Sequence, residues 1–262
     1  MALVLPAIGT LWWREITRFR RQRSRVIGAL AQPMLFWLLL GGGLSASFRP
    51  IGVPENLGYL EYFYPGIMVL AMLFTAIFAT IAVVEDRREG FLQGVMVAPV
   101  SRLNIVLGQS LGASTLAVLQ AAIFLILAPL VGITLSIGSL LAVFMVLALL
   151  AFGLTNLGLM IAWRLQSTQG FHAIMNLMLM PLWLLSGAFF PLTGVPLWLE
   201  WLMRINPITY GMAALRRCLY LGSDDVAGAV PALFPSLGIT LLFGMVTMVL
   251  AAATARRHHA VS

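Results

Sequence analysis

Six long apolar segments, separated by short polar stretches, dominate the pattern of residues along the chain. A helix needs roughly 20 apolar residues to cross about 30 Å of hydrocarbon. In lipid every backbone group needs a partner within the protein, so runs of this kind must be helical. The alternating pattern of a membrane barrel is absent. The predicted fold is an all-α polytopic membrane protein with six transmembrane helices, at about residues 26–46, 63–84, 105–131, 137–163, 172–190 and 232–255.

The segment before the first span, residues 1–25, has a different periodicity and no signal-peptide pattern. Its apolar side chains recur at helical spacing within roughly 140° of arc, with Glu15 intruding and most arginines outside. Such a segment suits an amphipathic helix in the membrane interface, with its arginines toward anionic lipid. The alternative is a basic flank that only fixes orientation. The apolar arc consists of Ile8, Leu11, Trp12, Ile16 and Phe19.

A second unusual segment, residues 190–217, follows the fifth span. Its apolar runs are too short to cross and are interrupted by Pro191, Pro196 and Pro207, which indicates interfacial or re-entrant helices. Glu200 and Arg204 stand four residues apart and can pair on one helix face. The segment could form an outer gate over a pathway or a packed plug, and the sequence leaves both open.

The composition indicates that lipid surrounds most of this chain. Apolar residues make up 61% and charged residues 10%, whereas soluble domains carry about 25% charged residues. The net charge of +7 is the excess of 16 basic residues, all of them arginine, over nine acidic ones. In so apolar a chain, cytoplasmic arginines explain this excess better than a nucleic-acid partner does. With the N-terminus inside, 12 arginines fall on the inner side and four outside, which predicts that both termini are cytoplasmic.

Several chemistries lack the residues they need. The six apolar cores hold no Asp, Glu, Arg or Lys, which disfavours proton-driven transport, although a sodium site of backbone carbonyls stays open. Without any lysine the chain cannot contain the phosphate-binding loop of an ATPase, so active transport would need a partner as its energy source. A single cysteine, Cys218, excludes an internal disulfide and a thiolate metal cluster.

Two short motifs could suggest a catalytic or a metal site. The stretch from Gly108 to Gly112 fits the nucleophile elbow of hydrolases, with Ser110 at its centre and His172 as a candidate base. The same two glycines satisfy a small-residue helix-packing motif, which is the better interpretation in an apolar segment. His258 and His259 follow two arginines, lack a nearby carboxylate, and are interpreted as a basic flank. We therefore expect neither a catalytic residue nor a metal site.

The densest run of charge lies just after the second span. Five consecutive charged residues, 85–89, are followed by Gly90 and then by the apolar residues of a short helix ended by Pro99. A charge run in general most often marks a solvated helix end. Here a short apolar face with a charged rim has no soluble surface of its own chain to cover it, and it suits docking to another protein.

The sequence of this loop, "EDRREGFLQGVMVAPVSRLNIVLGQSL", resembles the first cytoplasmic loop of ABC-2 type exporter permeases, which include nodulation-factor and daunorubicin-resistance permeases. The elements Glu89-Gly90-Phe91-Leu92 and Pro99-Val100-Ser101-Arg102 match that loop. The run from Asn206 to Tyr210 resembles the asparagine-proline core that these permeases carry between spans five and six.

The resemblance implies a homodimer of half-channels in the bacterial inner membrane, in contact with membrane lipid. Each copy would dock a cytoplasmic ABC ATPase subunit, which would bind the ATP and Mg. The loop would be the coupling helix, and the segment between spans five and six would brace the outer end. The coupling residues would be Glu85, Asp86, Arg87, Arg88, Glu89, Gly90, Phe91, Leu92, Pro99 and Arg102. The outer residues would be Glu200, Arg204, Asn206, Pro207 and Tyr210.

Cargo identity is the least constrained property. Methionines on the fifth span, at positions 175, 178 and 180, suit hydrophobic or amphiphilic cargo, though methionine at helical spacing is also ordinary packing. A drug, a lipid-linked glycan and a glycolipid all fit. The competing functions are a secondary transporter or facilitator without ATP coupling, a membrane scaffold for a cytoplasmic protein, and the hydrolase built on Ser110.

Overall fold

The computed structural model describes residues 4–44, 58–97, 100–221 and 230–257, which form helices and connecting turns without any strand. In this part of the chain, six helices are long and apolar enough to cross a membrane. The predicted all-α polytopic fold is therefore confirmed. The six helices span Val26–Leu44, Tyr59–Arg88, Arg102–Leu125, Ile137–Ala162, Thr168–Ala188 and Leu233–Arg256.

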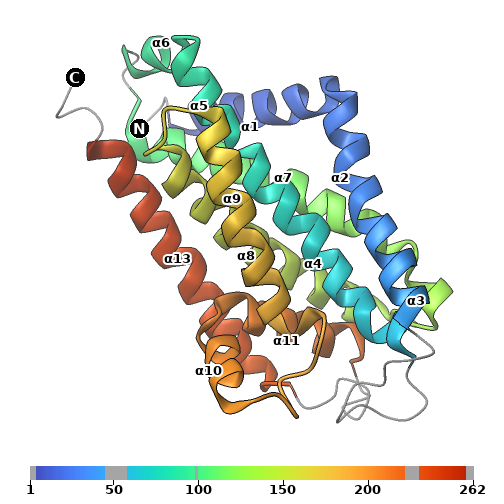
Figure 1. Cartoon of the computed structure of the whole chain (residues 1–262). Helices are drawn as coiled ribbons and strands as arrows, with labels where there is room; N and C mark the ends of the chain where they lie inside the picture. Colours follow the sequence, from blue (N-terminus) through green and yellow to red (C-terminus); the bar gives the residue numbers. More distant parts are fainter. Residues whose placement is uncertain (1–3, 45–57, 98–99, 222–229, 258–262) are drawn as a thin grey trace.

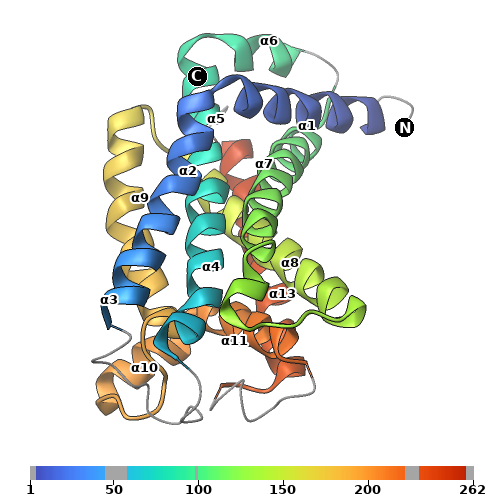
Figure 2. The same cartoon turned by 90° about the vertical axis from the view of Figure 1, so that its right-hand side faces the viewer.

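The first two helices meet at a sharp elbow. Helix α1 (Val4–Arg21) lies across one end of the bundle, and α2 (Arg23–Phe36) runs away from it into the bundle (Figures 1 and 2). Gln22 between them leaves the helical conformation, with φ −94° and ψ 74°. A π-helical turn (Trp37–Gly41) and α3 (Gly42–Leu44) complete the first span. The end that carries α1 is called the α1 end below.

The second span is the centre of the bundle. Helix α4 (Tyr59–Ala79) packs against α2 and against three later helices, α7 (Arg102–Leu125), α8 (Ile137–Ala162) and α9 (Thr168–Trp183). Its apolar side chains are almost all buried, and Figure 2 shows it between α2 and α9 on one side and α7 and α8 on the other. After Thr80 the span continues as α5 (Ile81–Arg88) toward the α1 end. Helix α5 is thus an extension of the most enclosed helix.

The third helix stops short of the predicted end of the third span at about residue 131. Helix α7 stops at Leu125, and a separate 3-10 helix (Ala128–Val131) follows before Gly132 adopts a left-handed φ of +79°. Pro129 explains the break, because proline has no N–H to donate and disfavours the α conformation in the residue before it.

Two shorter helices lie at the end of the bundle opposite α1, as expected for residues 190–217. Helix α9 ends in a π-helical turn (Leu184–Ala188), after which come α10 (Leu197–Ile205) and α11 (Pro207–Leu219) (Figure 1). Helix α10 exposes Trp198 and Trp201, whereas α11 is largely buried against α8 and α13 (Leu233–Arg257). The segment therefore combines a surface helix with a helix that re-enters the bundle.

Candidate functional site

The charged run forms the end of α5 and turns into a second short helix. Gly90 has φ +77°, a left-handed conformation that glycine adopts without the penalty a side chain would bring. Helix α6 (Phe91–Val97) starts directly after it and lies beside α1 at the α1 end of the bundle (Figure 1). The turn therefore presents α6 at an end surface of the molecule.

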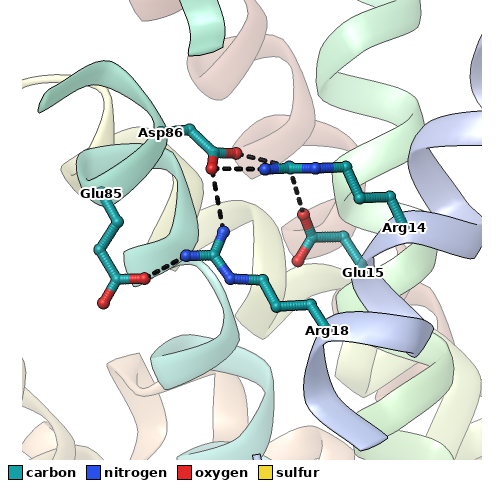
Figure 3. Close-up of polar contacts among 5 residues, drawn as sticks. All are labelled: Arg14, Glu15, Arg18, Glu85 and Asp86. Carbon is teal, nitrogen blue, oxygen red and sulfur yellow. Dashed lines mark hydrogen bonds and ion pairs between the residues drawn. The ribbon is translucent and has the colours of Figure 1, made fainter. Parts of the chain in front are cut away.

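Asp86 is the most enclosed residue of the run and is held by two arginines of α1. Its side chain is 1% exposed. Arg14 donates one hydrogen bond of 2.6 Å to each carboxylate oxygen, and Arg18 donates to Oδ1 at 3.0 Å (Figure 3). Arg18 also pairs with Glu85. These four residues, named here the α1–α5 ion-pair cluster, fix α1 onto the end of the second span through charge-assisted bonds.

The electrostatics of the cluster follow from its geometry. The hydrogen bond to Asp86 raises the pKa of Arg14, against an opposing effect of burial. The carboxylate of Glu15 lies 3.5 Å from the same guanidinium. Since carboxylates surround both arginines, the cluster attaches the two helices without leaving a buried cation unpaired.

Arg87 points to a different helix. It donates hydrogen bonds to the carbonyl oxygens of Ala162, Trp163 and Leu165 at 3.4, 3.0 and 3.2 Å, and its guanidinium lies 5.4 Å from the Trp163 ring centre. The last carbonyls of a helix have no partner within the helix and favour a nearby cation. Arg87 therefore ties α5 to the C-terminal end of α8.

The remaining residues of the loop divide between surface and core. Arg88 and Glu89 are exposed, and Phe91 is 41% exposed with the Arg14 guanidinium stacked 3.9 Å above its ring centre. Leu92 is buried. Pro99 lies outside the described residues. Arg102 donates to the carbonyl of Ala255 at 3.2 Å and so joins the start of α7 to the end of α13.

Gly108 and Gly112 form the contact between α1 and α7. A Cβ on Gly108 would lie 2.8 Å from the Cβ of Leu11, and a Cβ on Gly112 would lie 2.8 Å from that of Glu15. Trp12 donates to the hydroxyl of Thr115 at 3.1 Å nearby. The face of α1 that carries Leu11 and Glu15 thus packs on protein, and Glu15 belongs to the helix contact instead of disturbing an interfacial face.

Ser110 does not occupy a nucleophile elbow. It lies inside α7, with no strand before it in the described residues, and its side chain is fully buried. The elbow requires a sharp turn from strand to helix that exposes the serine oxygen. The His172 ring contacts the Phe78 ring at a tilt of 34°, with ring centres 5.2 Å apart. The geometry therefore gives no support to the hydrolase alternative.

The predicted outer residues come together at the end opposite α1. Arg204 donates two hydrogen bonds to Glu200, at 2.9 and 2.6 Å, and Tyr210 donates to the carbonyl of Arg204 at 2.9 Å. Asn206 donates to the Leu182 carbonyl at 2.7 Å and accepts a hydrogen bond from the backbone of the first turn of α11, where Pro207 is the first residue. Glu200, Arg204 and Tyr210 line a recess of about 570 Å³.

Arg216, in the same region, is buried, and the sequence did not predict this. The sequence analysis counts Arg216 only as one of the four outer arginines. Helix α11 carries it into the bundle, where it is 3% exposed. It donates to the carbonyls of Tyr62 and Gly187 at 3.2 and 3.4 Å and lies 4.0 Å from the Tyr62 ring centre. Its position in an amphipathic segment after Pro207 was the available signal. Arg216 attaches α11 to the second and fifth spans.

Comparison with known proteins relates this chain to membrane permeases. The ABC-2 type transporter family matches residues 6–220. The transport permease ycf38 of Cyanophora paradoxa is 31% identical over 78% of this chain and 70% of its own length. Nodulation protein J of Rhizobium leguminosarum bv. trifolii is 26% identical over 79% of this chain and 78% of its own. The ABC transporter permease YbhR of Escherichia coli (strain K12) is 26% identical over 72% of this chain and 51% of its own.

Proposed function

The chain belongs to the ABC-2 type transporter family, and from this membership we propose that it is the permease of an exporter driven by a separate ATPase. Membership makes it a multi-pass membrane permease component of an ABC transporter. The observation that carries the coupling proposal is the exposed group formed by Arg88, Glu89 and Phe91 on the turn between α5 and α6. This group, named here the docking group, combines mixed charges with an aromatic side chain, as protein interfaces commonly do.

The contacts of α5 suit the transmission of a force from the docking group. Asp86 connects α5 to α1, Arg87 connects it to α8, and α5 itself continues into α4 at the centre of the bundle. A displacement of α6 by a partner would therefore reach three elements at once. On this proposal the docking group contacts the ATPase directly, while Glu85, Asp86 and Arg87 pass the movement inward.

The wider assembly follows from the same proposal. Two copies of the chain would form the transport path, and each would bind one ATPase subunit that supplies ATP and Mg. The chain would lie in a bacterial inner membrane, with both termini in the cytoplasm. The outer recess with Glu200 and Arg204 would belong to the outer gate. The cargo would be hydrophobic or amphiphilic, namely a drug, a lipid-linked glycan or a glycolipid, and the relative YbhR, whose name includes multidrug transport, favours a drug-like molecule.

The runner-up is a secondary transporter or facilitator without ATP coupling. A secondary transporter would give the docking group no function, because no partner protein would bind to it. A membrane scaffold would use the docking group but would need no pathway. A secondary transporter predicts export that does not depend on ATP hydrolysis by a bound subunit, and a scaffold predicts no export by this chain.

The test is retention of the ATPase. A tagged chain is expressed in its native host and purified in mild detergent, and the ABC ATPase that remains bound is quantified. We expect the exchange Arg88→Glu with Glu89→Arg to lower retention by about tenfold, which corresponds to about 1.4 kcal/mol. The matched control is the exchange Glu200→Arg with Arg204→Glu at the opposite end, which should keep the ATPase. Absence of any bound ATPase, or equal retention in both exchanges, contradicts the proposal.

A further inference from the structure

A groove on the flank of the bundle lies between α1, α2 and α7. It has a volume of about 420 Å³ and is open on one side. Its walls are apolar, with Phe19 from α1, Ile27 from α2 and Leu119 and Ile123 from α7. The last three of these side chains are exposed, so the groove opens toward whatever surrounds the spans.

One polar group in the wall has no partner. Gln120 is 2% exposed and lines the groove, and its side-chain Nε2 makes no hydrogen bond within the part of the chain that the structure describes. A buried amide donor is almost always satisfied by an acceptor. An apolar groove with such a donor therefore suits a ligand that carries an oxygen acceptor next to a hydrocarbon chain.

The mouth of the groove is cationic. Arg20 lines it, Arg21 follows directly, and both are exposed. Neither has a carboxylate partner among the described residues. Arg14 and Arg18 of the same helix, in contrast, form ion pairs with carboxylates in the α1–α5 ion-pair cluster. The Arg20 guanidinium at the edge of an apolar groove attracts an anionic headgroup, and the exposed Arg21 next to it in the chain adds to the local positive charge.

We propose that this groove binds one anionic phospholipid of the surrounding leaflet. An acyl chain lies between α2 and α7, Gln120 donates to a lipid oxygen, and Arg20 binds the phosphate. A second copy of this chain in a two-fold contact through the groove would place its own Arg20 against Arg20 of the first copy, and these like charges repel. Zwitterionic phosphatidylcholine also carries a phosphate, but its choline cation cancels that charge and weakens the attraction to the arginines.

The groove shares no lining residue with the docking group. Its occupant would lie against the side of α1 next to the elbow at Gln22, and α1 carries the arginines of the ion-pair cluster. A bound lipid would therefore hold α1 in the position that Asp86 requires. Lipid composition would then act on the same helix that braces the docking group.

Direct counting of bound lipid tests the site. The purified chain is reconstituted in an equal mixture of phosphatidylcholine and phosphatidylglycerol with identical acyl chains, re-extracted in mild detergent, and examined by native mass spectrometry. The unmodified chain should retain one phosphatidylglycerol in preference to phosphatidylcholine. Arg20→Gln should lower this retention by about five- to tenfold. Gln120→Leu and Ile27→Trp, which remove the donor and fill the groove, should lower it as well.

The control is Arg256→Gln, an exposed arginine at the same end of the bundle but outside the groove, which should retain the lipid fully. Excess inorganic phosphate should not displace the lipid, because the acyl chain contributes most of the binding. The proposal is overturned if the unmodified chain shows no preference for phosphatidylglycerol or if Arg20→Gln and Arg256→Gln behave alike. It is also overturned if Ile27→Trp disrupts a dimer while lipid retention stays unchanged.

Discussion

Replacing Asp86 by asparagine probes the strongest polar contact between α1 and the second span. Loss of one member of a fully buried ion pair costs about 3–5 kcal/mol, because its partner stays buried and unpaired. Here the Arg14 and Arg18 side chains retain 29% and 19% exposure, so water can partly hydrate them. We therefore expect Asp86→Asn to lower the free energy of unfolding by about 2 kcal/mol.

A double-mutant cycle isolates the interaction itself. Asp86→Asn, Arg14→Gln and the double variant are unfolded in detergent, followed by tryptophan fluorescence, with exposed Glu89→Gln as the matched control. The two bonds of 2.6 Å between Arg14 and Asp86 predict a coupling energy of about 1–2 kcal/mol and a control within about 0.5 kcal/mol of the unmodified chain. Additive effects of the two single changes would refute the view that this pair fastens α1 to α5.

Four further outcomes follow from the packing. Gly112→Val should destabilise the chain by about 1–3 kcal/mol in a thermal melt, because the added side chain overpacks against α1. Its control is Gly9→Ala, where the structure has open space, and this change should be neutral or slightly stabilising. Buried Cys218 should resist a maleimide in detergent and react after denaturation. Arg216→Met should destabilise by about 1–3 kcal/mol, since it leaves two buried carbonyls without that donor. Ser110→Ala should preserve export in a transport assay, and a loss of export would revive the hydrolase.

The sequence was sufficient for the spans because length and hydropathy alone decide whether a helix can cross a membrane. A helix end differs from its predicted position where one residue breaks the helix within an apolar segment. Pro129 does so, because α7 ends before the apolar segment does. The outer segment was likewise recognisable from its prolines. Its division into exposed α10 and buried α11 was not, because that difference depends on which neighbours each helix meets.

Long-range pairing was the part that the sequence could not supply. Arg14 and Asp86 are 72 positions apart, and nothing local distinguishes Arg14 from the other arginines that favour the inner side. The spacing of Arg14 and Arg18, four residues apart on one helix face, was the only available hint that they act together. Arg216 was hidden for the same reason, since its burial results from the return of α11 into the bundle.

Helical geometry divides the charged run into parts with different roles. Successive residues on a helix point in directions about 100° apart, so the four charged residues 85–88 on α5 and the adjoining Glu89 could not all face one partner. The structure assigns Glu85 and Asp86 to α1 and Arg87 to α8, and leaves Arg88 and Glu89 exposed. The two parts should respond differently to substitution. Reversing the exposed pair should lower ATPase retention at unchanged stability, whereas Asp86→Asn should lower stability first and ATPase retention only as a consequence. If Asp86→Asn instead abolishes retention in a chain that melts normally, the inward-facing residues contact the ATPase directly and the division proposed here is wrong.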